Sequence, residues 1–206
     1  MRTKDEANEK KQRQRLLSAA WKLFRQKGYS NTTMEDILTE AECSKGRFYY
    51  YFHAKGELLD SLYELFDAEY EAAYASFSGD MSLQEKFRRL HTAMFTFMED
   101  EVGPELLTSL YISQLENKTG IDFWSRKRSY LRIVTELVRE GQEAGELRAD
   151  IDADTIADDL MVIERGQLID WCLRRASYSL KEIGPRNITR QIQGYRNIGH
   201  GDSPHG

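Results

Sequence analysis

Cysteine, proline and long apolar runs are all scarce in this sequence of 206 residues. The two cysteines, Cys43 and Cys172, lie far apart and form no C-x-x-C pair, so we expect neither a disulfide framework nor a zinc site. Both are expected to be reduced thiols, with Cys43 a small side chain in a turn and redox sensing as the alternative. No apolar run approaches the ~20 residues that cross a bilayer, so we expect no membrane span.

Residue patterns of common catalytic and metal sites are also missing. The histidines, His53, His91, His200 and His205, form no H-E-x-x-H or comparable ligand pattern. There is no glycine-rich phosphate loop and no G-x-S-x-G motif. The chain has 34 Asp and Glu residues, and most of them must lie on the surface, so their number does not indicate acid–base catalysis. We therefore expect neither an enzyme nor a cofactor or metal.

The composition is that of a folded protein, with 40% apolar and 31% charged residues and only 3 prolines. The N-terminus is charged and leads into an amphipathic segment instead of the apolar stretch of a secretory signal, which favours a cytoplasmic location.

The charge is divided unevenly along the chain. Residues 1–56 hold 12 Lys and Arg against 7 Asp and Glu, whereas the remaining residues hold 17 against 27. A basic front and an acidic back suggest that the first part faces a polyanion, although a charged solvated face is the simpler alternative.

Apolar residues recur at helical spacing throughout, and no stretch alternates with a period of two. The sequence therefore predicts an all-α fold of about nine helices, including one that starts at Asp122 with Trp124 facing inward and one near 180–195 that Gly184-Pro185 shortens or breaks. Residues 196–206 are rich in Gly, Pro and His, and we expect disorder there. The predicted helices are about 9–27, 33–41, 45–51, 55–79, 82–102, 104–116, 122–144, 153–176 and 180–195.

Residues 33–52 have the pattern of a helix-turn-helix, in which a short support helix precedes a helix with a polar outer face. Thr33 and Asp36 have the spacing of a capping box, and Ser44 caps the second helix. Phe48 and Phe52 fall on its inner side, but a seven-residue helix cannot also bury three tyrosines. The tyrosines and cations at 45–51 are therefore expected to face a duplex.

The segment GYSNTTMEDILTEAECSKGRFYYYFHAKGELL resembles the DNA-binding signature of TetR-family repressors. The likeness covers residues 10–65 closely and the rest by the number and order of helices. It implies a helix-turn-helix DNA-binding domain at 1–54, a helical effector-binding and dimerisation domain at 55–195, and a tail at 196–206.

The resemblance also implies roles for single residues. Lys45, Gly46 and Arg47 match the base-facing start of the recognition helix, and Arg47 suits paired hydrogen bonds to guanine. Tyr49, Tyr50 and Lys55 match positions that usually hold the DNA backbone, and Thr33 matches the cap that presents helix amides to phosphate. The full set predicted to bind double-stranded DNA is Thr33, Ser44, Lys45, Gly46, Arg47, Tyr49, Tyr50, Tyr51 and Lys55.

Three positions depart from the family pattern. Glu42 stands where family members commonly have glycine, so a left-handed backbone there would be strained. Tyr51 replaces a frequent histidine, and Ala54 replaces the usual Ser or Asn cap. These departures affect the individual DNA contacts, so the family does not predict the operator sequence, and they leave the predicted fold unchanged.

By resemblance, a small-molecule effector binds among the helices of the second domain. Aromatic and methionine side chains favour an apolar or aromatic ligand, although such stripes at helical spacing are more often core. The acidic balance favours a cationic ligand, with a solvated charged face as the usual alternative. The candidates are Tyr63, Phe66, Tyr70, Met94, Phe97, Met98, Tyr111, Trp124 and Tyr130.

The resemblance also implies a homodimer joined through the last two long helices. The predicted interface is Leu160, Ile163, Gly166, Gln167, Trp171, Ile188, Ile192 and Tyr195. The expected function is that of a repressor that binds a palindromic operator as a dimer and is released by its effector. The alternative is a helical ligand-binding or adaptor protein whose helix-turn-helix no longer binds DNA, with an enzyme a distant third.

Overall fold

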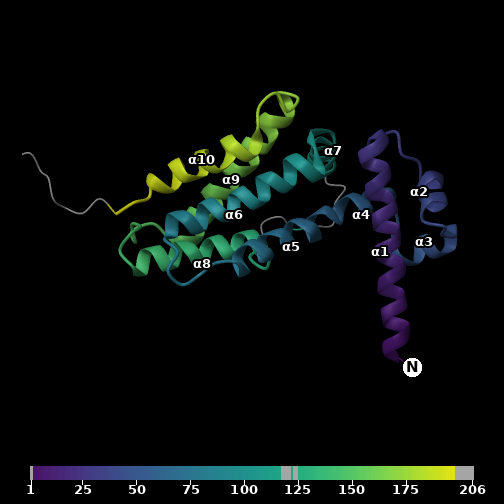
Figure 1. Cartoon of the computed structure of the whole chain (residues 1–206), viewed down its shortest axis with the longest axis horizontal. Helices are drawn as coiled ribbons and strands as arrows, with labels where there is room; N and C mark the ends of the chain where they lie inside the picture. The colour runs from purple at the N-terminus through teal and green to yellow at the C-terminus, as the bar shows by residue number, and fades with distance from the viewer. Residues whose placement is uncertain (1, 117–121, 123–124, 198–206) are drawn as a thin grey trace, which may run out of the picture. The chain divides into compact units, whose positions relative to one another are not determined.

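A computed structural model of the chain describes residues 2–116, 122 and 125–197. Within these ranges the chain forms helices joined by turns, with no strand, which confirms the predicted all-α fold (Figure 1). No helix in this part of the chain is both long enough and apolar enough to span a bilayer. In chain order the elements are α1 (Arg2–Lys27), α2 (Met34–Glu40), α3 (Lys45–Tyr51), α4 (Lys55–Asp60), α5 (Leu62–Ala75), α6 (Leu83–Phe97), the π-helix η1 (Met98–Val102), α7 (Pro104–Leu115), α8 (Ser129–Glu143), α9 (Ala153–Leu173) and α10 (Leu180–Gln193).

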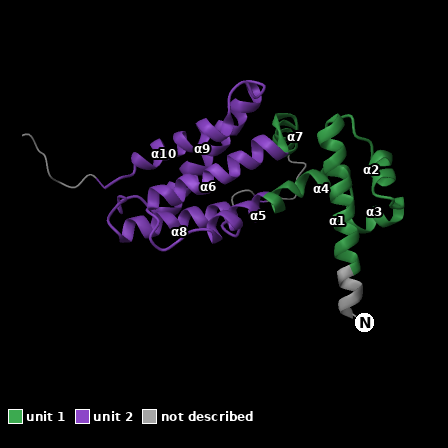
Figure 2. Ribbon diagram, viewed as in Figure 1, with its two compact units in different colours: residues 1–65, 102–121 green, residues 66–101, 122–206 purple. Residues whose placement is uncertain are grey.

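The chain divides into two compact units (Figure 2). The first comprises residues 1–65 and 102–121, and the second comprises residues 66–101 and 122–206. The first unit therefore holds α4 and α7 in addition to the three N-terminal helices. The predicted domain boundary after residue 54 stays a prediction, and most of the predicted tail, residues 198–206, lies outside the described residues.

In the first unit, α1, α2 and α3 pack around a small apolar core. Ile37 of α2 and Phe48 of α3 are fully buried, together with Ala20 of α1. The predicted capping box is confirmed, because the Asp36 amide donates to Thr33 Oγ1 at 3.1 Å and the Thr33 amide donates to Asp36 Oδ2 at 2.7 Å. These local bonds start α2 at a fixed point and thereby set where the following turn falls.

The predicted fourth helix, over 55–79, is interrupted. α4 ends at Asp60, and α5 runs from Leu62 to Ala75. At the break, Ser61 is buried and its hydroxyl donates to the Leu58 carbonyl at 2.6 Å. A serine that bonds the preceding turn competes with the regular helical ladder, which accounts for an interruption that helical periodicity does not reveal.

In the second unit, α6 packs along α10 and α8 packs along α9 (Figure 1). The predicted break at Gly184-Pro185 is wrong, because α10 is continuous over both residues. Both are buried, and a Cβ on Gly184 would lie 2.4 Å from the Phe95 ring. Close packing against α6 thus compensates for the one helical hydrogen bond that Pro185 cannot donate.

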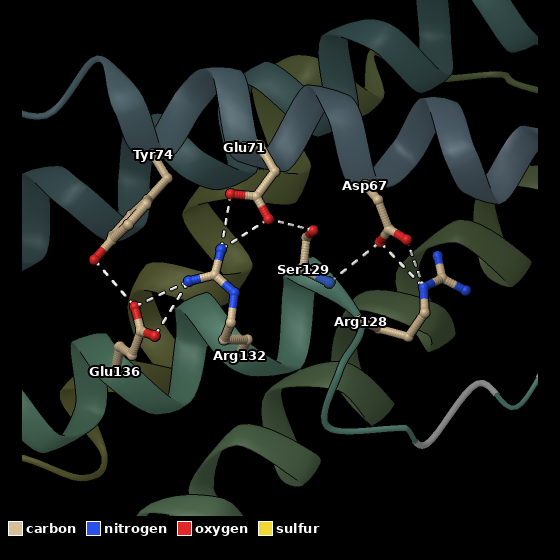
Figure 3. Close-up of polar contacts among 7 residues, drawn as sticks. All are labelled: Asp67, Glu71, Tyr74, Arg128, Ser129, Arg132 and Glu136. Atoms are coloured by element: carbon tan, nitrogen blue, oxygen red, sulfur yellow. Dashed lines mark hydrogen bonds and ion pairs between the residues drawn. The ribbon is translucent and has the colours of Figure 1, made fainter. Parts of the chain in front are cut away.

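The predicted start of a helix at Asp122 is also wrong, because α8 begins at Ser129. The Ser129 amide donates to Asp67 Oδ1 of α5 at 3.3 Å, and Arg128 Nε donates to Asp67 Oδ2 at 2.8 Å (Figure 3). A carboxylate from another helix therefore satisfies the first amide of α8, which a reading of local caps cannot anticipate. Trp124 lies outside the described residues.

Further polar contacts join α5 and α8 beyond Ser129. Arg132 pairs with Glu71 at 2.7 Å and with Glu136 at 3.1 Å, and the Tyr74 hydroxyl donates to Glu136 Oε2 at 3.1 Å (Figure 3). Because these ion pairs are partly exposed to solvent, each contributes little to stability. Their main effect is to fix the register of α5 on α8.

Candidate nucleic-acid interface

The turn between α2 and α3 has a left-handed residue at Glu42, with φ of 48°. This confirms that the backbone takes there the conformation that favours glycine. The Cys43 amide donates to the Leu38 carbonyl at 2.9 Å and closes the turn, and Glu42 forms an ion pair with Arg15 of α1. The turn is thus held on both sides despite its strained residue.

Helix α3 presents a polar and aromatic face to solvent. Ser44 caps it by accepting a hydrogen bond from the Arg47 amide at 3.3 Å, and Phe48 anchors the opposite side in the core. Lys45, Gly46 and Arg47 are exposed, and the Lys45 and Arg47 side chains form no ion pair among the described residues. Two unpaired cations at one helix end are suited to contact phosphate oxygens and base edges.

Two of the three tyrosines on α3 are strongly exposed, Tyr49 by 47% and Tyr50 by 66%. The Tyr49 ring leans edge-on against Phe48, and Tyr51 is half-buried with its ring 4.9 Å from that of Tyr50. The Tyr50 hydroxyl donates to Glu9 Oε1 of α1 at 3.0 Å, which raises the pKa of the phenol. The prediction that Tyr49 and Tyr50 lie on the surface is confirmed.

Lys55 lies in a different setting from the one that the sequence suggested. Its Nζ donates to the carbonyls of Tyr29 and Thr32, each at 2.9 Å, and lies 4.2 Å from the centre of the Tyr29 ring. Partial burial lowers the pKa of the ammonium. The structure therefore places the Lys55 ammonium group against the loop between α1 and α2, where it fixes the segment that leads to the cap of α2.

Thr33 is likewise engaged within the protein. Its amide is bonded to Asp36, whose carboxylate also accepts Lys27 Nζ at 2.6 Å. These hydrogen bonds to Lys27 and Thr33 lower the pKa of Asp36. The predicted absence of a cap at Ala54 is confirmed: the residue makes no side-chain capping bond, and the His53 amide donates to Glu57 Oε2 at 3.0 Å instead.

The predicted effector residues do not all fall in one unit. Tyr63 and Tyr111 belong to the first unit, whereas Phe66, Tyr70 and the other described candidates belong to the second. In the second unit Phe97 is half-buried, and the buried candidates are Phe66, Tyr70, Met94, Met98 and Tyr130.

Sequence reasoning missed two residues that complete a group with Tyr70 and Tyr130. His91 of α6 and Glu164 of α9 are 0% and 8% exposed, and we call the four residues the buried polar cluster. Helical spacing places both residues on apolar faces: His91 lies four residues after Phe87, and Glu164 lies midway between Leu160 and Leu168. A polar residue on a buried helix face is the signal that the sequence offered.

Hydrogen bonds link the members of this cluster. Tyr70 donates to Glu164 Oε1 at 2.5 Å, while His91 Nε2 lies 3.5 Å from the Tyr130 hydroxyl and 3.4 Å from Glu164 Oε2. Burial lowers the pKa of His91 to about 4 and raises that of Glu164 to about 7. It also raises the pKa of Tyr130 well above its ordinary value.

Several predicted dimer residues lie inside the protomer. Leu160, Trp171, Ile188 and Ile192 are at most 4% exposed, and the Trp171 indole donates to the Tyr178 carbonyl at 3.0 Å. Ile163, Gln167 and Tyr195 are half-buried, and of the predicted set only Gly166 is exposed. The outer face of α9 instead carries Val162, Gly166, Ile169 and Leu173, with Val162 56% and Leu173 78% exposed.

Neither cysteine forms a disulfide, and both are half-buried. The Cys43 thiol donates weakly to the Ser44 carbonyl at 3.6 Å. Among the described residues no group of three or more His, Cys, Asp or Glu side chains is arranged to hold a metal ion.

Comparison with known proteins gives consistent similarities. The family model "Bacterial regulatory proteins, tetR family" matches residues 16–62, which include the α2–α3 unit. The chain is 26% identical over 79% of its length to the HTH-type transcriptional repressor DhaR of Mycobacterium sp. (strain GP1), covering 83% of that protein. It is also 26% identical over 95% of its length to the HTH-type transcriptional repressor BepR of Brucella suis, covering 96% of that protein.

Solved structures share the fold. The chain matches the TetR-family repressor FadR of Thermus thermophilus, solved in complex with lauroyl-CoA, with a TM-score of 0.73 and 20% identity over 94% of this chain and 98% of that one. It matches the regulatory protein TetR of Rhodobacter sphaeroides with a TM-score of 0.61 and 25% identity, over 89% of this chain and 97% of that one.

Proposed function

We propose that the chain is a DNA-binding transcriptional regulator of the TetR family, and that it acts as a homodimeric repressor that binds a palindromic operator and is released by a small-molecule effector. Because a regulator of this kind acts on the chromosome, we place its action in the cytoplasm. The matched relatives are regulators, and we assign this chain no enzymatic activity.

The observation that carries the proposal is the outer face of α3. Lys45 and Arg47 are exposed beside Tyr49 and Tyr50, while Phe48 holds the helix to the core from the other side. Cations and phenol hydroxyls fit phosphate oxygens, and an arginine can form two hydrogen bonds with guanine O6 and N7. Gly46 has open space around the position of a Cβ, so the backbone can approach a duplex closely there.

A dimer is supported by the outer face of α9. Val162, Gly166, Ile169 and Leu173 follow one another at intervals of three or four residues, which puts them on one side of the helix. Leu173 and Val162 are among the most exposed large apolar side chains of the described residues. We propose that a second copy of the chain covers this stripe, with Gly166 permitting close approach of the two helices.

The effector is proposed to bind in the second unit. In support, this unit buries aromatic and methionine side chains around a few convergent polar groups, which is the usual make-up of a small-molecule site.

The test is selection of genomic DNA fragments by the purified protein, followed by fluorescence anisotropy on the selected site. We expect fragments that share one symmetric sequence. Replacing Arg47 by Ala should cost about 1–3 kcal/mol on that site and relax the preference at one base pair of each half-site. Uniform weakening on all sequences would contradict the role given to Arg47, and failure to enrich any sequence would favour the adaptor alternative.

A further inference from the structure

The core of the second unit contains a carboxyl oxygen to which none of the described residues donates a hydrogen bond. Glu164 Oε2 is buried and has no hydrogen-bond partner in the part of the chain that the structure describes, although Oε1 of the same carboxyl accepts from Tyr70. A buried acceptor without a donor costs about 1–3 kcal/mol, so such a group in a folded core points to a partner that is supplied from outside.

The neighbouring histidine does not fill this need in its neutral form. His91 Nδ1 lies 2.8 Å from the Phe87 carbonyl, which can only accept, so Nδ1 carries the ring hydrogen. Nε2 then presents a lone pair at 3.4 Å from Glu164 Oε2. When Glu164 is protonated, its O–H can donate to Nε2, which also lies 3.5 Å from the Tyr130 hydroxyl. When Glu164 is ionised, Oε2 and Nε2 are both acceptors, and a donor that enters from outside would satisfy Oε2.

Aromatic rings lie around the other three members of the buried polar cluster. The rings of Phe87 and Phe95 each lie 6.3 Å from His91, and those of Tyr70 and Tyr130 lie 5.1 Å apart. Ring faces together with a carboxylate are the surroundings that an organic cation prefers, because both attract positive charge.

Two methionines that follow His91 could adjust their packing to a bound ligand. Met94 and Met98 are buried one and two turns beyond His91, and unbranched methionines repack readily around a ligand. Met98 is the first residue of the π-helix η1, which follows α6 directly, and π-helices are often found at functional sites.

We propose that the buried polar cluster is the effector-recognition site and that it takes an organic cation with an apolar body, whose N–H group donates to Glu164 Oε2. The inference deepens the proposed function and rests on it. It adds the chemical class of the effector and the residue that selects it.

Proton linkage follows from the same geometry. The pKa of Glu164 is raised to about 7 by burial, against the lowering effects of the Tyr70 hydrogen bond and of Arg165. The cation binds the ionised carboxylate, so binding to the protonated form requires the carboxyl to lose its proton to solvent. Since the pKa of His91 is about 4 and that of Tyr130 is raised, neither titrates near neutrality. Binding should therefore be about tenfold tighter at pH 8 than at pH 6.

The experiment compares three probes with one carbon skeleton, phenylbutylamine, phenylbutanol and phenylbutyrate, by calorimetry on the full chain. Wild-type protein should bind the amine at least about tenfold more tightly than the alcohol, with the butyrate weakest. Glu164→Gln should remove this preference and the pH dependence while leaving affinity for the alcohol unchanged. The matched control Glu143→Gln, which changes an exposed glutamate of α8, should behave as wild type.

Equal binding of amine and alcohol by wild type, no binding of the amine, or an unchanged preference in Glu164→Gln would each overturn the inference. Circular dichroism of Glu164→Gln verifies that the variant folds, and the pH dependence of the wild type tests the inference without any variant. The outcome is separable from that of the proposed function. Protein that selects an operator but ignores the amine contradicts only this inference, whereas protein that binds the amine but no DNA contradicts only the proposed repressor.

Discussion

Lys55 offers a test of whether a lysine beside the recognition helix touches DNA or holds the protein together. Family resemblance assigned it to the DNA backbone, but its Nζ donates to two loop carbonyls, those of Tyr29 and Thr32. We predict that Lys55→Met destabilises the protein and leaves the salt dependence of DNA binding unchanged. The same substitution at the exposed Lys45 should do the opposite.

The magnitude follows from the two hydrogen bonds. A hydrogen bond to a charged group contributes about 1.5–3 kcal/mol when buried, but Lys55 is half-buried and water can partly replace it. We therefore expect a loss of about 1–2 kcal/mol, which lowers the melting temperature of a chain this size by about 2–8 °C. Lys45→Met removes no such bond and should change the free energy of unfolding by no more than about 0.5 kcal/mol, which shifts the melting temperature by no more than about 2 °C.

The assay combines thermal melting at fixed protein concentration with fluorescence anisotropy on the selected operator at several salt concentrations. Each lost phosphate contact reduces the slope of log affinity against log salt by about 0.9. Lys45→Met should reduce the slope by this amount per bound protomer. A reduced slope with an unchanged melting temperature in Lys55→Met would refute the structural role and restore the phosphate contact.

Two further predictions concern the second unit. Gly184→Ala should lower the free energy of unfolding by about 1–3 kcal/mol, because its Cβ would lie 2.4 Å from the Phe95 ring. The control Gly46→Ala, with open space around the new Cβ, should leave the melting temperature unchanged or slightly raised. Equal shifts of the melting temperature in the two variants would contradict this account. The double change Val162→Glu with Leu173→Glu should convert the dimer to a monomer in sedimentation equilibrium. The control Leu115→Glu, at a similarly exposed leucine of α7, should leave the dimer intact. A dimer that survives the double change would show that the interface does not lie on this face of α9.

The interplay of local and distant contacts explains where the predictions failed. The start predicted for α8 was wrong because Asp67, more than sixty residues earlier, satisfies the Ser129 amide, as the 3.3 Å hydrogen bond shows. The predicted break in α10 was wrong because burial against Phe95 outweighs the local cost of Pro185. In both cases the deciding partner lies on another helix.

The sequence by itself determined the capping box at Thr33, the left-handed turn at Glu42 and the exposed face of α3, since each depends on residues within a few positions of one another. Only the tertiary structure decided that Lys55 donates to loop carbonyls and that Glu164 lies beside His91 in the core. It also decided that Leu173 of α9 is exposed while Trp171 is buried. Helical periodicity fixes which residues share a face but not which neighbour that face will meet, and the chemistry of a buried site depends on that neighbour.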